Sequence, residues 1–320
     1  MLPKKQYFTS APVDEVSLFS KADEIIATYD DTLISYEELL QINKRDGIDI
    51  ATAVLYRSLL RDISRQEFKT KIDLLSVRPP AKLKNVKILL VPGMFYKEYP
   101  DVGSGGDLII DIAKKFDYNV EQVQTESLGS PTDNKAKVVK SIILNSNADN
   151  LWVISVSRGG AEVRLALQDI GKANMPSNFG GWINISGVVN GTPLADSKFT
   201  NTTQQYLHTA FCKAVGMSTS LAKDSRTNSD LWAQPIALPA HSELIHVLGF
   251  PLLSHVEGSV AKRFKKLVQF GPNDGIIPLY DTLKLPGNIY PIWGADHLLR
   301  VPQYSELIYK LMTYINKKSN

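Results

Sequence analysis

The stretch Asn150–Gly160, which reads NLWVISVSRGG, joins two kinds of local structure around one serine. Its first part, Leu151–Ser155, is short, apolar and partly β-branched, which is typical of a buried strand. The residues that follow, Ala161–Leu167, repeat apolar side chains at helical spacing. We therefore expect a strand to turn into a helix close to Ser157.

The five residues Ser155–Gly159 fit a nucleophile elbow, in which small residues stand two positions before and after an exposed serine. Small residues are needed there because the strand and helix backbones approach each other closely. Such a turn would hold Ser157 Oγ above the sheet edge, at a helix N-terminus whose dipole favours an oxyanion. A plain strand-to-helix corner with a serine N-cap is the alternative interpretation.

The composition is that of an ordinary globular protein. The chain has 320 residues, of which 43% are hydrophobic and 22% are charged, enough for one large α/β domain with an attached segment or for two domains. The net charge is +3 and the lysines are scattered, so we expect no nucleic-acid partner. The single Cys212 excludes an intramolecular disulfide and a multi-cysteine metal site, and fits a reducing compartment.

The sequence favours a cytoplasmic location. Residues 1–8 lack the apolar core of a signal peptide, although a trimmed secreted chain would look the same. No apolar run reaches the roughly 18 residues of a membrane span, so no transmembrane segment is expected.

Residues 1–80 are expected to form a helical N-terminal extension to a domain over 81–320. The range Val13–Tyr29 has an amphipathic pattern, Ser35–Glu38 is a capping box, and Asp49 can cap a helix over Ile50–Phe68. These helices could pack on the sheet, cover the site or support a homo-oligomer, and the sequence leaves the three roles open.

The remainder alternates strands and helices. We expect strands at 86–93, 118–125, 151–155, 181–187, 243–250, 266–270 and 288–293. This alternation implies an α/β fold with a doubly wound, mostly parallel sheet and right-handed crossovers. The alternation is lost at about 190–241, a range rich in Thr, Ser, Asn and Gln, where we expect a helical insertion that forms a cap or lid.

Three functional groups follow one another as Ser157, Asp274 and His297. Each follows a predicted strand, and open α/β sheets place their sites at that end of the strands. Serine needs a positioned base to act as a nucleophile. His297 would take the serine proton, and Asp274 would hold the imidazole in the correct tautomer.

Several of these segments resemble bacterial lipases and esterases of the α/β-hydrolase superfamily. The resemblance rests on the elbow, on 184–196 with its Gly-Thr and Ala-Asp pairs, on the Asn-Asp-Gly loop at 271–278 and on the histidine loop 294–297. It spans 86–320 and includes the order Ser, Asp, His. It implies an α/β-hydrolase fold, and hydrolysis of a small-molecule carboxylic ester or other acyl substrate through an acyl-enzyme. It also implies a mobile cap over an acyl pocket. A serine hydrolase of this kind is expected to need no metal or cofactor. Ser155, Arg158 and the Val-Pro-Gly at 91–93 depart from the lipase pattern.

An oxyanion needs two donors, and two backbone N–H groups are candidates. Arg158 follows the nucleophile, and Met94 lies in the loop after the first strand of the domain. Gly93 would let the backbone approach the reacting carbonyl. Gly93, Phe95 and Tyr96 are candidate substrate contacts, but the aromatic rings could equally pack against the N-terminal helices.

Other residues invite competing interpretations. His255 is the second candidate for the base, whereas His246 alternates with apolar neighbours in a strand and is expected to be packed. Arg158 and Arg164 could meet an anionic substrate, although Arg164 is more typical of a solvated helix residue. The loop Gly103–Gly106 has the glycines of a phosphate-binding loop but not its Lys-Ser/Thr pair.

The sequence thus predicts a serine esterase or lipase-like enzyme. A thioesterase or acyltransferase with the same triad is one alternative. A catalytically silent hydrolase fold that only binds is the other.

Overall fold

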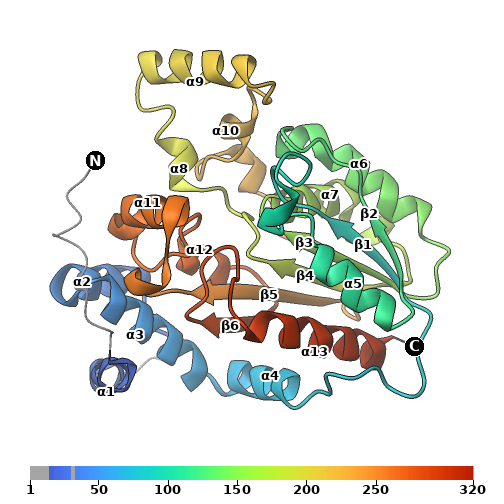
Figure 1. Cartoon of the computed structure of the whole chain (residues 1–320), viewed down its shortest axis with the longest axis horizontal. Helices are drawn as coiled ribbons and strands as arrows, with labels where there is room; N and C mark the ends of the chain where they lie inside the picture. Colours follow the sequence, from blue (N-terminus) through green and yellow to red (C-terminus); the bar gives the residue numbers. More distant parts are fainter. Residues whose placement is uncertain (1–13, 30–32, 320) are drawn as a thin grey trace.

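The computed structural model describes residues 14–29 and 33–319. Within them, one sheet runs in the order β2-β1-β3-β4-β5-β6, and all neighbouring strands are parallel (Figure 1). The strands are β1 Lys87–Val91, β2 Asn119–Gln122, β3 Leu151–Val156, β4 Phe179–Ile185, β5 Glu243–Phe250 and β6 Asn288–Trp293. The predicted fold class, a layered α/β structure with a parallel sheet, is confirmed.

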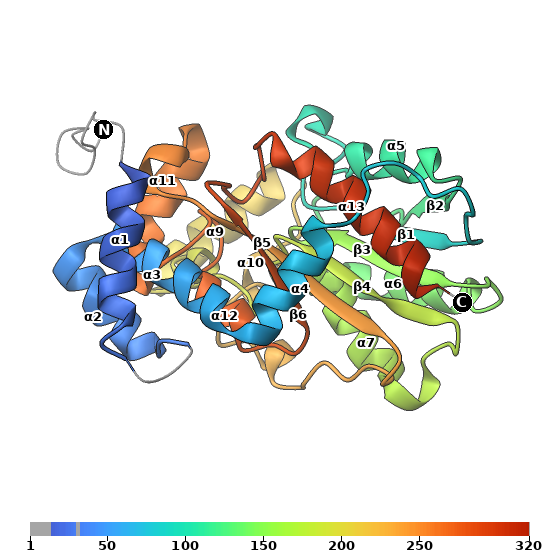
Figure 2. The same ribbon diagram turned by 90° about the horizontal axis from the view of Figure 1, so that it is seen from below.

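Helices cover both faces of the sheet, which explains why the central strands are apolar on both sides. On one face, α4 (Ile63–Asp73), α5 (Asp107–Lys115) and α13 (Gln303–Lys318) share a core with alternate residues of β1 and β3. On the other face, α6 (Pro131–Leu144) and α7 (Gly159–Asn174) pack against the intervening residues. Figure 2 shows α4 and α13 crossing the sheet.

The N-terminal helices belong to the same packed body as the sheet. The helices α1 (Glu15–Ile26), α2 (Tyr36–Asp46) and α3 (Ile48–Arg61) share a hydrophobic cluster with β5, β6 and α12 (Leu279–Leu283). They lie at the β6 end of the molecule, away from α9 (Thr202–Ala214) (Figure 1). Of the three roles considered for this segment, packing on the sheet is the one that the described contacts show.

The prediction of one helix over Ile50–Phe68 is wrong. Two helices, α3 and α4, meet at Asp62, whose extended backbone ends the first and whose side chain accepts from Arg65 N. The expected cap, Asp49, lies inside α3, and its side chain accepts from Leu253 N at 2.7 Å. The start of the range Val13–Tyr29 and the signal-peptide interpretation of residues 1–8 lie outside the described residues.

The strand predicted at 266–270 is also wrong. This range holds the end of α11 (Gly258–Leu267) and a short 3₁₀ turn, η4 (Val268–Phe270). Val260, Phe264 and Leu267 are buried at helical spacing, so the apolar run belongs to an amphipathic helix. The predicted strand at 118–125 is shorter, since β2 ends at Gln122.

Residues 190–241, called the cap below, contain no strand in the structure, as the sequence predicts. They form α8 (Pro193–Asp196), α9, α10 (Leu221–Asp224) and the 3₁₀ turn η2 (Asp230–Trp232). In Figure 1, α9 stands clear of the sheet.

Two further 3₁₀ turns are η1 (Pro100–Val102) and η3 (Leu253–His255). No helix in the described ranges combines the length and apolar character that crossing a bilayer requires.

The substitution Leu55→Ala tests whether the N-terminal helices stabilise the sheet. Leu55 is fully buried in the cluster shared with β5 and β6, so its truncation should lower the free energy of unfolding by about 2–5 kcal/mol. Urea unfolding followed by tryptophan fluorescence measures this, because Trp152 and Trp182 lie in the sheet. The exposed Ile63→Ala is the matched control. An unchanged midpoint in Leu55→Ala would contradict the shared core.

Candidate active site

The structure brings Ser157, His297 and Asp274 into one hydrogen-bonded line. Ser157 Oγ lies 2.8 Å from His297 Nε2, and His297 Nδ1 lies 2.7 Å from Asp274 Oδ2. Ser157 stands between β3 and α7, and His297 follows β6. These separations are within hydrogen-bonding range, so a proton can pass from the serine to the imidazole.

The backbone at Ser157 has the strained form of a nucleophile elbow. Ser157 has a φ of 52°, and helix α7 begins at Gly159. A Cβ atom on Gly159 would lie 2.4 Å from Val91 O, so only glycine fits at that position. The peptide N–H of Ser157 donates to Ile185 O at 2.9 Å, which ties the turn to β4. The turn therefore points the Ser157 hydroxyl away from β3 and β4.

Asp274 is fully buried, and both of its carboxylate oxygens accept hydrogen bonds. Oδ1 accepts from the backbone N–H groups of Ile276 and Ile277 at 2.8 and 2.9 Å, which leaves Oδ2 directed at the imidazole. The N–H of His297 donates to Asp274 O at 2.9 Å. The acid is thus placed by its own loop after η4, and not by a strand as the sequence prediction had it.

The two candidate oxyanion donors lie beside the serine. The backbone N–H groups of Met94 and Arg158 have no hydrogen-bond partner among the described residues, and both residues line the cavity at Ser157. Gly93 lets this loop come close, because a Cβ atom there would lie 3.2 Å from Ser157 Cβ. Gly93 itself is not part of the cavity wall.

The Arg158 side chain does not face a substrate. Its guanidinium donates to the carbonyls of Ser127, Gly129 and Glu126 at 2.6, 2.9 and 3.0 Å. Its Nε lies 2.8 Å from Glu162 Oε1, and both side chains are buried. The prediction that Arg158 could meet an anionic substrate is therefore wrong for the side chain, which fixes the 126–129 loop to the elbow helix.

Glu162 is the charge that balances Arg158 inside the protein. Burial raises the pKa of Glu162 to about 7, against the opposing effects of Arg158 and of the Asn134 amide. Asn134 Nδ2 donates to Glu162 Oε1 at 2.8 Å. Both protonation states of the Glu162 carboxyl group are therefore populated near neutral pH.

Arg164 is also buried, so its assignment as a solvated helix residue is wrong. Its guanidinium donates to the carbonyls of Val189, Trp232 and Gln234 at 2.7, 2.7 and 3.0 Å. It also contacts the Asn190 side chain. Arg164 thereby fastens the last part of the cap to helix α7.

Ser155, which replaces the usual glycine of the elbow, is part of a buried polar network. Its hydroxyl accepts from Trp182 Nε1 at 2.8 Å and donates to Asn184 Oδ1 at 3.1 Å. The Asn184 amide is 3.0 Å from His246 Nδ1. His246 is buried as predicted, and burial lowers its pKa to about 4. Ser155, which departs from the lipase pattern, thus has its hydrogen-bond partners on β4.

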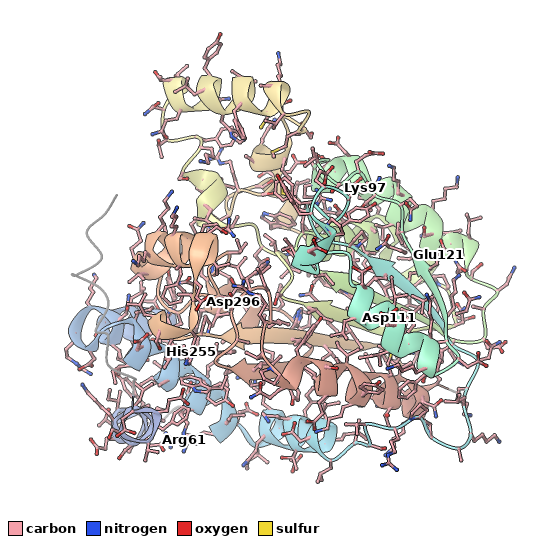
Figure 3. All side chains as sticks on the ribbon, in the orientation of Figure 1. Arg61, Lys97, Asp111, Glu121, His255 and Asp296 are labelled. Atoms are coloured by element: carbon pink, nitrogen blue, oxygen red, sulfur yellow. The ribbon has the colours of Figure 1, made fainter. Side chains whose placement is uncertain are left out.

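The other candidate base, His255, lies elsewhere. Its Nε2 is 3.4 Å from Glu15 Oε1 on α1, and its Nδ1 accepts from Leu252 N at 3.2 Å. Figure 3 shows His255 beside the N-terminal helices. Asp296, next to His297, accepts from Leu298 N and pairs with Arg300, so its carboxylate shapes its own loop.

A cavity of about 1040 Å³ opens at Ser157 and His297. Its wall is mainly apolar and combines the 94–109 loop, the cap and the loop after His297. The apolar wall residues include Met94, Phe95, Tyr99, Val102, Leu108, Val156, Ile185, Val188, Leu194, Leu221, Ile276, Leu298 and Val301. The cavity could hold an acyl chain.

The aromatic pair Phe95 and Tyr96 divides between two roles. Phe95 lines the cavity, and its contact with a substrate stays a prediction. Tyr96 does not, because its side chain is buried and its hydroxyl donates to Thr125 O at 2.8 Å. The contacts of both rings are therefore made outside the N-terminal helices. The alternative in which the two rings pack against those helices is not what the structure shows. The Gly103–Gly106 loop contributes Gly103, Ser104 and Gly106 to the wall.

Sequence reasoning missed several wall residues. Arg263 on α11 and Arg300 after His297 line the cavity, as do Lys198 and His208 in the cap. No motif marks them, because they come from segments that only the fold brings together. Among the described residues, no group of three His, Cys, Asp or Glu side chains is arranged to hold a metal ion.

Comparison with solved structures identifies the fold. The chain is similar to a metagenomic carboxyl esterase, MGS0156, with a TM-score of 0.58 and 16% identity, over 74% of this chain and 78% of that one. It is also similar to the propeptide form of Bacillus licheniformis lipase BlEst2, with a TM-score of 0.51 and 15% identity, over 72% of this chain and 51% of that one. No protein family model matches, and the curated proteins contain no significant sequence match. The chain has the α/β-hydrolase fold.

The substitution Glu162→Gln tests the buried carboxyl group through pH. The folded state raises the pKa of Glu162 from 4.5 to about 7. Between these two pH values the folded protein therefore keeps a proton on Glu162 that the unfolded chain has released. The free energy of unfolding should therefore fall as pH rises from about 4.5 to 7, by at most about 1.4 kcal/mol per pH unit.

Glu162→Gln should flatten that slope in urea unfolding measured across this window. Glu67→Gln, at an exposed position on α4, is the control and should keep it. Equal slopes in wild type and Glu162→Gln would show that Glu162 does not titrate there.

Proposed function

We propose that this protein is a serine hydrolase that cleaves carboxylic esters through an acyl-enzyme. The observation that carries the proposal is the line of Ser157, His297 and Asp274, with its serine end at an apolar cavity. The similarity in fold to a carboxyl esterase and a lipase supports it.

The first half of the reaction would acylate Ser157. As Ser157 Oγ attacks the ester carbonyl carbon, its proton passes to His297 Nε2 over the 2.8 Å contact. The carbonyl oxygen becomes an oxyanion, for which the N–H groups of Met94 and Arg158 are the available donors. Collapse breaks the bond to the alcohol oxygen, which takes the proton from His297, and the acyl group stays on Oγ.

The second half would return the enzyme to its starting state. A water molecule gives a proton to His297 Nε2 and attacks the acyl carbon. The resulting oxyanion collapses, the bond to Oγ breaks, and His297 returns the proton to Ser157. The carboxylic acid then leaves. Throughout, Asp274 Oδ2 accepts from His297 Nδ1, which keeps Nε2 free for both transfers.

The cap is proposed to complete the acyl pocket. Residues 190–241 supply Leu194, Ala195, Leu221 and Ala222 to the cavity wall. We also propose the division of the chain into an N-terminal helical segment over 1–80 and a hydrolase domain over 81–320 that contains this insertion.

The substitution Ser157→Ala tests the nucleophile. Wild type should hydrolyse members of a 4-nitrophenyl ester series from acetate to palmitate, and Ser157→Ala should lower kcat by roughly 10⁶-fold, since it removes the attacking oxygen. Ser155→Ala is the matched control, because the Ser155 hydroxyl is buried against Trp182 and should not be acylated. Activity that survives in Ser157→Ala and disappears in Ser155→Ala would contradict the proposal.

The substitution Asp274→Asn tests the tautomer. An amide nitrogen in place of Oδ2 would force a proton off Nδ1 and onto Nε2, so kcat should fall by about 10⁴-fold. Asp296→Asn, at the carboxylate beside His297, should have a much smaller effect. Comparable losses in the two variants would mean that Asp274 has no special place in the mechanism.

A further inference from the structure

The charged residues of the cavity wall are of one sign. Arg158, Lys198, Arg263 and Arg300 line it, and among the described residues no aspartate or glutamate does. An apolar acyl pocket needs no such charge. The wall therefore carries a feature that ester hydrolysis alone does not explain.

Three of these cations are neutralised or solvated. The buried Arg158 pairs with Glu162 at 2.8 Å. Arg300 Nη2 pairs with Asp296 Oδ2 at 2.8 Å, and its side chain is 55% exposed. Lys198 is exposed on the cap. Exposed charges are screened by water and salt, and they discriminate little between ligands.

Arg263 is different. It is half-buried on α11, and its Nη2 donates a hydrogen bond to Ser259 Oγ at 3.3 Å. Its Nε is buried without a hydrogen-bond partner, and no carboxylate lies within ion-pair distance in the described part of the chain. Burial lowers the pKa of Arg263, while Asp274 and Asp296 oppose that effect from farther away.

The two carboxylates that act on the pKa of Arg263 are already engaged. Asp274 accepts from His297 and from two backbone N–H groups, and Asp296 accepts from Leu298 N and Arg300. A partly desolvated guanidinium with spare donors costs free energy unless an anion satisfies it. The cavity is where that anion can enter, because Arg263, Ser157 and His297 line the same space.

We propose that the substrate of this hydrolase is an ester that also carries a carboxylate, and that Arg263 binds that carboxylate. This inference rests on the proposed function and names its substrate class. A guanidinium matches the planar fork of a carboxylate. A monoanion also balances a single cation, whereas a phosphate dianion would leave surplus negative charge near Asp274.

The test compares anionic esters with neutral esters of the same shape. One pair is mono-4-nitrophenyl adipate and its amide, 4-nitrophenyl adipamate, which place the charge in the acyl part. The other pair is 4-acetoxybenzoate and 4-acetoxybenzamide, which place it in the alcohol part. Rates in Ser157→Ala are subtracted as background.

Wild type should prefer the anionic member of at least one pair by roughly tenfold or more in kcat/KM, the size expected for hydrogen bonds to a charged group. The pair that shows the preference identifies which half of the ester meets Arg263. In Arg263→Gln the ratio should fall to about one, and in Arg263→Lys it should be intermediate, because the charge stays but the fork is lost.

Lys262→Gln is the matched control. It removes the same charge from an exposed position on the same helix, outside the cavity wall, and should leave the ratio unchanged. The absence of any preference in wild type overturns the inference while the esterase proposal stands. Equal losses on both members of each pair in Arg263→Gln also overturn it, because they assign Arg263 a structural role. If wild type and Ser157→Ala are alike on all the esters, the proposed function itself fails.

Discussion

The close contact between the start of α7 and the end of β1 is the constraint on which the site depends. Gly159 packs against Val91 O so tightly that no side chain fits, and Ser157, two residues earlier, has a left-handed conformation. That conformation points the hydroxyl at His297 and leaves the Arg158 N–H without an internal partner. Strain of this kind persists only where the surroundings determine it. Here the pairing of β3 with β1 on one side and β4 on the other fixes the backbone.

Buried arginines hold the surroundings of the elbow. Arg158 and Arg164 both project from the first turns of α7, and each donates to several backbone carbonyls. Arg158 fixes the loop at 126–129, and Arg164 fixes the end of the cap. A planar guanidinium with five donors suits this task, because loop carbonyls have no ladder partners of their own. The start of α7, next to Ser157, therefore also organises two walls of the cavity.

Much of the fold and the central residues could be predicted from the sequence, for reasons that are local. Strand β3, the elbow and α7 show their periods directly, and the order Ser157, Asp274, His297 proved to describe one hydrogen-bonded line. The sequence predicts Asp274 correctly as the partner of His297, but the strand that it predicts before Asp274 is wrong. The apolar run at 266–270 ends an amphipathic helix, and short apolar runs do not distinguish strand from helix.

The remaining misses involve long-range contacts. Arg164 has the pattern of a solvated helix residue, and only the packing of the cap brings the carbonyls of Trp232 and Gln234 to it. Phe95 and Tyr96 are neighbours in sequence, yet the turn sends one into the cavity and the other to Thr125. Arg263 lies in no motif and meets the site only through the position of α11. Local pattern carries no information about such partners.

One measurement tests the central claim most directly. The wild-type protein is treated with a fluorophosphonate, digested, and the modified peptide is sequenced by mass spectrometry. The account predicts a single phosphonyl adduct on Ser157, which forms because His297 activates that hydroxyl and the neighbouring N–H groups receive the phosphonyl oxygen. An adduct on Ser155, or no adduct on a folded protein, would contradict it.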